Sequence, residues 1–453
     1  MEVSIISRET VKPSSLPLNQ LKPYKLCLFD QITPMTYASI MVFYRNTDPN
    51  FNDNLPQTLA QLKKSLSETL TFFYPFSGRT KENLYVEDFD AGVTYVEAKV
   101  SCSLTEFFKL KQNELLNQFV PYLPWRNETQ ETPQEELPQI GFQVNTFACG
   151  GIALASSLGH KITDGGTLSH FLMSWATSFR GFPQKIIRPN LSDATVVFPP
   201  RDLPSKYLNL RDKQWFGMGN LVTKRFVFDA NAVATLREIA KSERVPKPSR
   251  NEALTCFVWK HASAAAAVAT GTPKASVIAH AANMRPRMKS NALNTAIGNL
   301  FWWARADSAD VRTEEISDLV GTLRGSLVSF NDEYLESMEG EVGYAAVTEF
   351  YDSLEDILNP EEPEKAPEIY GFTNWNGFFN EVDFGWGKPV WVGAHGKVGS
   401  EFRNLVVFVD AQGGKGIEAF VTLEENHMAV LEKDSEFLAF VCPNPEGLPV
   451  CML

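Results

Sequence analysis

A histidine at the end of a predicted strand is the first candidate for chemistry. His160 stands in the string SSLGHKITDGG, where a β-type run (152–158) ends and a helix is predicted to begin near Gly166. A side chain between the end of a strand and the start of a helix is expected to be exposed and rigidly supported. The unpaired backbone amides of the helix N-terminus lie beside it. A neutral imidazole in such a position can accept a proton near neutral pH. These residues predict a general base, and a structural histidine is the open alternative.

Asp164 follows this histidine four residues later. In a helix that spacing would place both side chains on one face, but Gly165 and Gly166 indicate a turn. The two side chains therefore need not touch, and Asp164 can instead brace the turn by pairing with an arginine elsewhere. The other five histidines are expected to be structural, because they lie in helical or β-type runs, in a glycine-rich loop or beside a predicted helix cap: His170, His261, His280, His395 and His427.

Local motifs indicate neither a protein nucleophile nor a metal site. The chain has no HExxH, GxSxG, GxxxxGK or GxGxxG string, which are the signatures of zinc, serine, phosphate and dinucleotide chemistry. A Cys–His pair stays open on sequence alone, although no cysteine sits in a known signature. Direct transfer to a nucleophile on the substrate fits this pattern better than a covalent enzyme intermediate does.

Composition narrows the class of protein. The chain has 453 residues and a net charge of −12, so a basic surface for nucleic acid or an anionic membrane is not expected. Its six cysteines have no CxxC pair, and the first residues lack the apolar run of a signal peptide. We expect a cytoplasmic monomer with no membrane or nucleic-acid partner.

Strand and helix patterns are mixed along the chain, which predicts a layered α/β (mixed α+β) fold. The proline-rich stretch 181–219 has little periodicity and is interpreted as a crossover between two domains. The predicted division is an N-terminal domain over 1–190, a crossover loop over 191–219 and a C-terminal domain over 220–453. The predicted strands cover 37–44, 94–100, 140–147, 152–158, 222–228, 276–281, 405–409 and 417–423, and the predicted helices cover 59–70, 168–179, 232–242, 252–270, 313–335 and 428–440.

Two motifs, HKITDG (160–165) and DFGWGKP (383–389), stand about 220 residues apart. In this order they resemble the HxxxDG and DFGWG marks of the plant BAHD acyltransferases. Further stretches are similar to the family along the whole chain: FFYPFSGR (72–79), NMRPRM (283–288), IGN (297–299), TNW (373–375) and the segment 416–434.

The resemblance implies two similar chloramphenicol-acetyltransferase-like domains, each a mixed sheet with flanking helices, joined by the crossover loop. Part of 370–400 is expected to pack with the N-terminal domain. Acyl-CoA would enter a channel between the domains from one face and meet the acceptor at His160. It also implies that Asp164 pairs with Arg285 or Arg287. The second motif is expected to form a structural turn on the CoA side, through Asp383, Gly385, Trp386 and Gly387.

The same resemblance implies acyl-CoA as a cosubstrate, with neither a bound cofactor nor a metal. A thioester is already activated, so one base and a few hydrogen-bond donors suffice. The candidates for binding CoA are Arg250, Lys260, Arg285, Arg287 and Thr373. For each cation, a solvated charged surface explains the residue equally well.

The sequence says less about the acyl donor and the acceptor than about the reaction. Anthocyanin malonyltransferases of the family carry YFGNC, whereas this chain has AIGNLFWW (296–303), which argues against malonyl transfer. The sequence is most similar to the branch of vinorine synthase and other alkaloid or alcohol acetyltransferases. We expect acetyl-CoA or another short aliphatic acyl-CoA as donor and a hydroxyl of a plant specialised metabolite as acceptor. The alternatives are N-acyl transfer to an amine, a thioesterase or hydrolase, and a ligand-binding relative without turnover.

Overall fold

The computed structural model describes residues 1–15, 20–46, 51–110, 112–124, 132–217, 219–362, 365–398, 404–411 and 415–443. Its first sheet has six strands in the order β1–β6–β7–β8–β3–β13. Only the β6–β7 pairing in this sheet is parallel. The strands are β1 (Val3–Val11), β6 (Val93–Val100), β7 (Ile140–Phe147), β8 (Ile152–Gly159), β3 (Tyr37–Tyr44) and β13 (Trp391–Gly393).

The second sheet has seven strands in the order β11–β10–β12–β14–β15–β9–β16. Its central pairings, β10–β12 and β12–β14, are parallel. Its strands are β11 (Phe301–Ser308), β10 (Ser276–Asn283), β12 (Glu368–Asn374), β14 (Leu405–Asp410), β15 (Ile417–Glu424), β9 (Leu221–Phe228) and β16 (Cys442–Pro443). A small third sheet holds β2 (Tyr24–Lys25), β5 (Tyr85–Glu87) and β4 (Arg79–Lys81).

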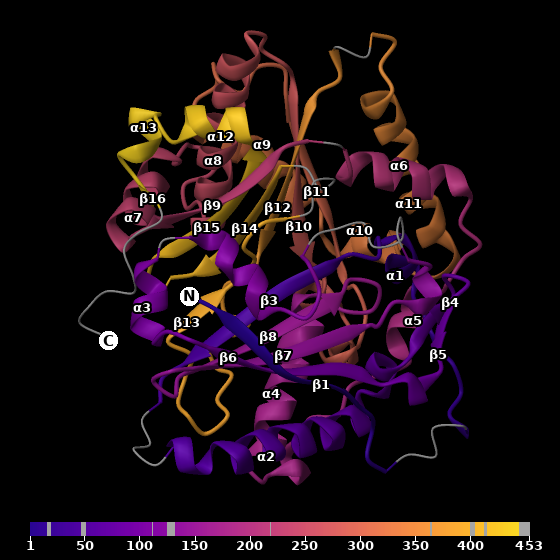
Figure 1. The fold of residues 1–453 in the computed structure, drawn as a ribbon. Helices are drawn as coiled ribbons and strands as arrows, with labels where there is room; N and C mark the ends of the chain where they lie inside the picture. Colours follow the sequence, from indigo (N-terminus) through magenta and orange to yellow (C-terminus); the bar gives the residue numbers. More distant parts are fainter. Residues whose placement is uncertain are drawn as a thin grey trace.

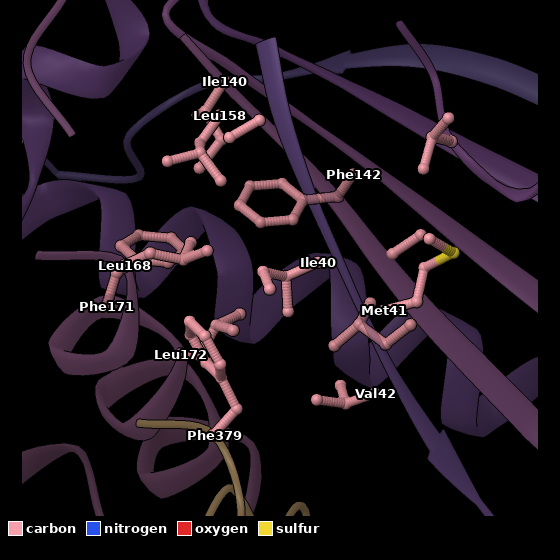
Figure 2. Close-up of a cluster of buried hydrophobic side chains, with 14 of the residues drawn as sticks. Ile40, Met41, Val42, Ile140, Phe142, Leu158, Leu168, Phe171, Leu172 and Phe379 are labelled. Atoms are coloured by element: carbon pink, nitrogen blue, oxygen red, sulfur yellow. The ribbon is translucent and has the colours of Figure 1, made fainter. Parts of the chain in front are cut away.

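Two long helices cover the first sheet, α2 (Phe51–Phe72) and α4 (Gly165–Phe179), and they lie below it in Figure 1. Figure 2 shows why α4 packs there: Leu168, Phe171 and Leu172 meet Phe142 from the sheet. The leucine and phenylalanine spacing in α4 gives one apolar face, which burial stabilises. Phe379, from far along the chain, joins this same cluster.

Helices on the second sheet surround α8 (Arg250–Thr270), against which α7, α9 and α12 pack. Ser249 begins α8 with a capping box to Glu252, and Gly271 ends it in the left-handed conformation, φ +71°. The remaining helices are α1 (Leu28–Ile32), α3 (Leu104–Lys109), α5 (Asp193–Val197), α6 (Ser205–Trp215), α7 (Ala230–Ile239), α9 (Ile316–Val328), α10 (Asp332–Ser337), α11 (Gly340–Leu358), α12 (Glu425–Leu431) and α13 (Ser435–Leu438).

The two halves interlock through the segment that follows the second motif. β13 leaves the second half of the chain and pairs antiparallel with β3 at the edge of the first sheet. The Trp391 indole packs on Phe43, with ring centroids 4.9 Å apart, and its Nε1 donates to Glu418 of the second sheet at 3.0 Å. One buried apolar cluster therefore continues from the first sheet into residues of the second.

The predicted mixed α/β fold with two sheet-bearing halves is confirmed. The expectation of a loop over 191–219 is wrong in part, because α5 and α6 lie within it. Leu210 and Trp215 give α6 a buried side, and α6 packs against α11, an interaction that local periodicity does not reveal. The predicted helix over 313–335 is interrupted between α9 and α10, and α11 was not predicted. The exact domain boundaries stay a prediction.

Candidate active site

His160 lies directly after β8, at the junction of the two halves. Its backbone amide donates to the Thr36 carbonyl at 2.9 Å, which ties the end of β8 to the residue before β3. Four residues later Asp164 begins α4 by accepting the Thr167 amide on Oδ1 at 2.8 Å. The turn lies at residues 160–162, and the glycine pair that was expected in it forms the first residues of α4 instead. The helix N-terminus therefore lies four residues after the histidine.

Asp164 pairs with Arg285 of the second half. Its Oδ2 also accepts the Leu300 amide at 3.0 Å. The Arg285 guanidinium donates in addition to Thr167 Oγ1 and to the Gly298 carbonyl, both at 3.0 Å. Burial alone would raise the pKa of Asp164, but the Arg285 charge and these hydrogen bonds hold it below the ordinary value. The structure brings Asp164 together with Arg285 and not with Arg287.

Asn299 is a polar neighbour of the His160 ring, and sequence reasoning gave it no role. Its Oδ1 lies 2.9 Å from Nδ1 of His160. Its Nδ2 donates to the carbonyls of His160 at 2.7 Å and Lys161 at 3.2 Å, and to Asp30 Oδ1 at 3.0 Å. Because the contact joins residues 139 positions apart, no local pattern could have announced it. The IGN stretch marked the position only as similar to the family.

Burial lowers the pKa of the His160 imidazole, while the hydrogen bond with Asn299 and the charge of Asp164 oppose that shift. The imidazole is therefore neutral at neutral pH. A neutral imidazole with one ring nitrogen engaged by the protein can accept a proton on the other.

A cavity opens between the two sheets at His160, with about 910 Å³ of space between its atoms, open solvent included. Six of its lining side chains are aromatic. They come from α6, β11, β12 and the segment after β12: Trp215, Phe301, Trp303, Phe372, Trp375 and Phe378. The polar lining is uncharged apart from His160 and the Asp164–Arg285 pair, and consists of Thr33, Thr36, Asn283, Thr373 and Asn374. No serine or cysteine lines the cavity in the described part of the chain.

The five candidates for binding CoA do not gather in one place. Arg285 and Thr373 line the cavity, but the Arg285 guanidinium is buried in its ion pair. Arg250 begins α8, and its Nη2 lies 3.5 Å from Oδ1 of Asp410. Lys260 lies farther along α8, and its ammonium donates to the Glu314 carbonyl. Arg287 is exposed and donates to the Asn283 carbonyl at 2.7 Å.

The second motif forms a turn outside the cavity lining. Asp383 Oδ1 accepts the amides of Gly385 at 2.7 Å and Gly387 at 3.0 Å. Both glycines have positive φ, +94° and +86°, which other residues rarely adopt. The Trp386 ring packs against Tyr44 of the first sheet, with centroids 5.3 Å apart. The turn therefore docks onto the first half of the molecule.

The described residues contain no group of three or more His, Cys, Asp or Glu side chains placed to hold a metal ion. None of their helices combines the length and the apolar character needed to cross a bilayer.

The two sheets therefore meet at a cavity that His160 lines. Residues 1–438 match the Transferase family, and the chain belongs to this family, the plant BAHD acyltransferases. The chain is an acyltransferase.

Relatives match over almost the whole chain. Akuammiline synthase 2 from Alstonia scholaris is 36% identical over 98% of both chains. The limonoid 7-O-acetyltransferase of Citrus sinensis is 35% identical over 98% of this chain and 99% of its own. The crystal structure of vinorine synthase superposes with a TM-score of 0.79 at 28% identity, covering 99% of this chain and 100% of that one.

Proposed function

We propose that the chain transfers a short aliphatic acyl group, acetyl first among them, from CoA to a hydroxyl of a plant specialised metabolite. His160 is the general base. One observation carries this proposal: the His160 ring lines the interdomain cavity and its Nδ1 lies within hydrogen-bond distance of Asn299, so we assign the substrate proton to Nε2.

The reaction needs only one proton carrier. His160 takes the hydroxyl proton while the hydroxyl oxygen attacks the thioester carbonyl carbon. The carbon–sulfur bond then breaks, the thiolate of CoA takes the proton from the imidazolium, and an ester is released. The Asn283 and Asn374 side-chain oxygens each accept a backbone amide, from Arg285 and Asn376. Their NH₂ groups remain as donors for the carbonyl oxygen during attack.

The lining favours a bulky, uncharged acceptor. Six aromatic side chains line the cavity. The one cation in its described lining, Arg285, is already paired with Asp164, so a carboxylate would lack a partner charge there. An alkaloid or terpenoid alcohol fits these walls, and the Citrus sinensis relative is named for acetylating a limonoid.

The placement of CoA stays a proposal. Arg287 is the exposed cation nearest in sequence to the cavity residue Arg285, so we propose it for a CoA phosphate in preference to Arg285 itself. Binding by Arg250, Lys260 and Thr373, the monomeric state and the cytoplasmic location remain predictions.

The test is a matrix of acyl-CoAs against alkaloid, terpenoid, sugar and amine acceptors, read by mass spectrometry. His160→Ala should lower transfer by about 10²- to 10⁴-fold with acyl-CoA binding retained. His170→Ala is the matched control, because His170 hydrogen-bonds the Ile187 carbonyl outside the cavity lining. Transfer by His160→Ala above about a tenth of the wild-type rate would refute the assignment. CoA release that is independent of any alcohol would identify a hydrolase instead.

A further inference from the structure

Asp30 is a fully buried carboxylate that the reaction described above does not use. It lies in α1, far from His160 in the sequence. Its Oδ2 accepts the Cys27 amide at 2.9 Å, which forms part of a helix cap. Its Oδ1 accepts both the backbone amide of Asn299 at 2.8 Å and Nδ2 of Asn299 at 3.0 Å. The carboxylate therefore holds Asn299 by its backbone and its side chain.

The surroundings of Asn299 permit only one orientation of its amide. Three acceptors face Nδ2: the carbonyls of His160 and Lys161 and the Asp30 carboxylate. A flipped amide would place Oδ1 against these three oxygens and lose every one of the bonds. Oδ1 must therefore face Nδ1 of His160, and because an amide oxygen can only accept, Nδ1 must carry the proton.

Close packing supports this arrangement from the other side. Gly298 has φ +130°, and a Cβ there would lie 3.3 Å from both carboxylate oxygens of Asp30. The Lys161 ammonium donates to the carbonyls of Asp30 at 3.2 Å and Gln31 at 2.9 Å, which fixes the end of α1 against the residue after the histidine. Neither α1 nor the 298–299 backbone can shift without breaking buried hydrogen bonds.

We propose that Asn299, held by Asp30, is a positioning residue that fixes His160 in the Nδ1–H tautomer. The Nε2 lone pair is then the one offered to the acceptor hydroxyl. This inference rests on the proposed function of His160 as the base. Asp30 acts on the histidine indirectly: its carboxylate hydrogen-bonds Asn299, and Asn299 contacts the imidazole. In a neutral imidazole only one nitrogen can accept a proton, so the wrong tautomer would present an N–H to the acceptor.

The tautomer can be read without any substrate. In histidine-labelled protein, nitrogen-15 NMR separates protonated from unprotonated ring nitrogens, and the spectrum of His160→Gln identifies the His160 signals. At a pH where the ring is neutral we expect a protonated Nδ1 and an unprotonated Nε2. A protonated Nε2 in the wild-type protein would overturn the inference, whatever the enzyme's activity proves to be.

Kinetics give the second readout. Asn299→Leu keeps the side-chain size but removes the acceptor, so kcat should fall by about 10- to 100-fold, the range found for residues that orient a metal-bound histidine. The KM for acyl-CoA should stay within about twofold. Asp30→Asn should lower kcat in the same direction and by a smaller factor, since the carbonyls of His160 and Lys161 still orient the amide.

Asp434→Asn is the matched control. Asp434 also caps a helix and contacts a histidine, His261 at 2.6 Å, but outside the cavity lining. It should lose stability while keeping kcat. If Asn299→Leu kept the wild-type kcat, or lost kcat only in step with its loss of folded protein, the positioning role would be refuted. A wild-type chain with no acyl transfer would refute the proposed function alone, because the NMR result stands apart from it.

Discussion

Burial lowers the pKa of the His160 imidazole, and the hydrogen bond with Asn299 and the charge of Asp164 oppose that shift only in part. The base therefore stays neutral to a lower pH than free histidine, whose ordinary pKa is 6.5. We expect kcat/KM to be level above pH 6.5 and to fall only below it, since the neutral form is active and protonation removes it. A pH–rate profile with saturating acyl-CoA measures this. An inflection above pH 6.5 would contradict it.

The buried Asp164–Arg285 ion pair is expected to stabilise the fold around the site. Both side chains are almost fully buried, and Asp164 also caps α4. Asp164→Asn leaves Arg285 as an uncompensated buried charge, so unfolding free energy should fall by about 3–5 kcal/mol, with activity falling alongside. Denaturant titration measures the loss.

The exposed pair Lys12–Asp90 provides the control for that substitution. Asp90→Asn should change stability little, because solvent screens an exposed pair. An Asp164→Asn enzyme that was inactive at unchanged stability would place Asp164 in the catalytic machinery, against our interpretation.

At the scale of elements, hydrogen bonds to the Asp383 carboxylate hold the turn of the second motif together. Asp383 accepts two amides within the turn, and both donors belong to glycines with positive φ. Asp383→Ala removes both acceptors, so the turn and the Trp386 contact with Tyr44 should loosen. We expect weaker activity through poorer acyl-CoA binding or poorer folding, with the low-pH limb of the rate profile unchanged.

The neighbouring exposed residue Glu381, paired with Lys388, gives the comparison. Glu381→Ala should retain both activity and thermal stability. The structural interpretation fails if Asp383→Ala loses an ionisation from the pH–rate profile while its CoA affinity stays that of the wild type.

Some helices and strands could be predicted from the sequence alone, and others could not. The runs 37–44 and 140–147 are strands as predicted, and every residue in both is buried. The largely apolar run 37–44 is typical of a strand buried on both faces. The three-residue β13 could not be predicted, since it is a strand only because β3 offers it an edge. In α11 a buried stripe of Val347, Tyr351, Leu354 and Leu358 has helical spacing, a signal that was present and was missed.

The candidate site divides in the same way. His160 was identifiable because its position after a strand and before a helix is a local property. Asn299, Asp30 and the aromatic wall depend on contacts between segments more than 100 residues apart. Only the assembled fold brings them together.

At the scale of the whole molecule, buried histidines tie stability to pH. Burial lowers the pKa of His280 to about 4 and that of His395 to about 3. Asp30 acts with the opposite sign, because burial raises its pKa from 3.8 to about 6. On acidification the unfolded chain binds protons that the native histidines refuse, while native Asp30 binds one more readily than it does when unfolded. The pH dependence of wild-type stability is therefore the sum of contributions of opposite sign.

A single substitution isolates one of them. His395 lies next to β13, buried against Phe420 at 5.8 Å between ring centroids. Its contribution is fully present above pH 6.5, the ordinary value, and is lost as pH falls toward about 3. Each proton taken up by the unfolded chain alone costs about 1.4 kcal/mol per pH unit. His395→Leu removes this group and leaves Asp30, His280 and His160 in place, so their contributions cancel in the difference from wild type. Denaturant titrations between pH 6.5 and 5 should show the variant losing less stability per pH unit than wild type, by about that amount. Equal slopes would mean that His395 titrates alike in the folded and unfolded chains, and that burial at this junction does not hold it neutral.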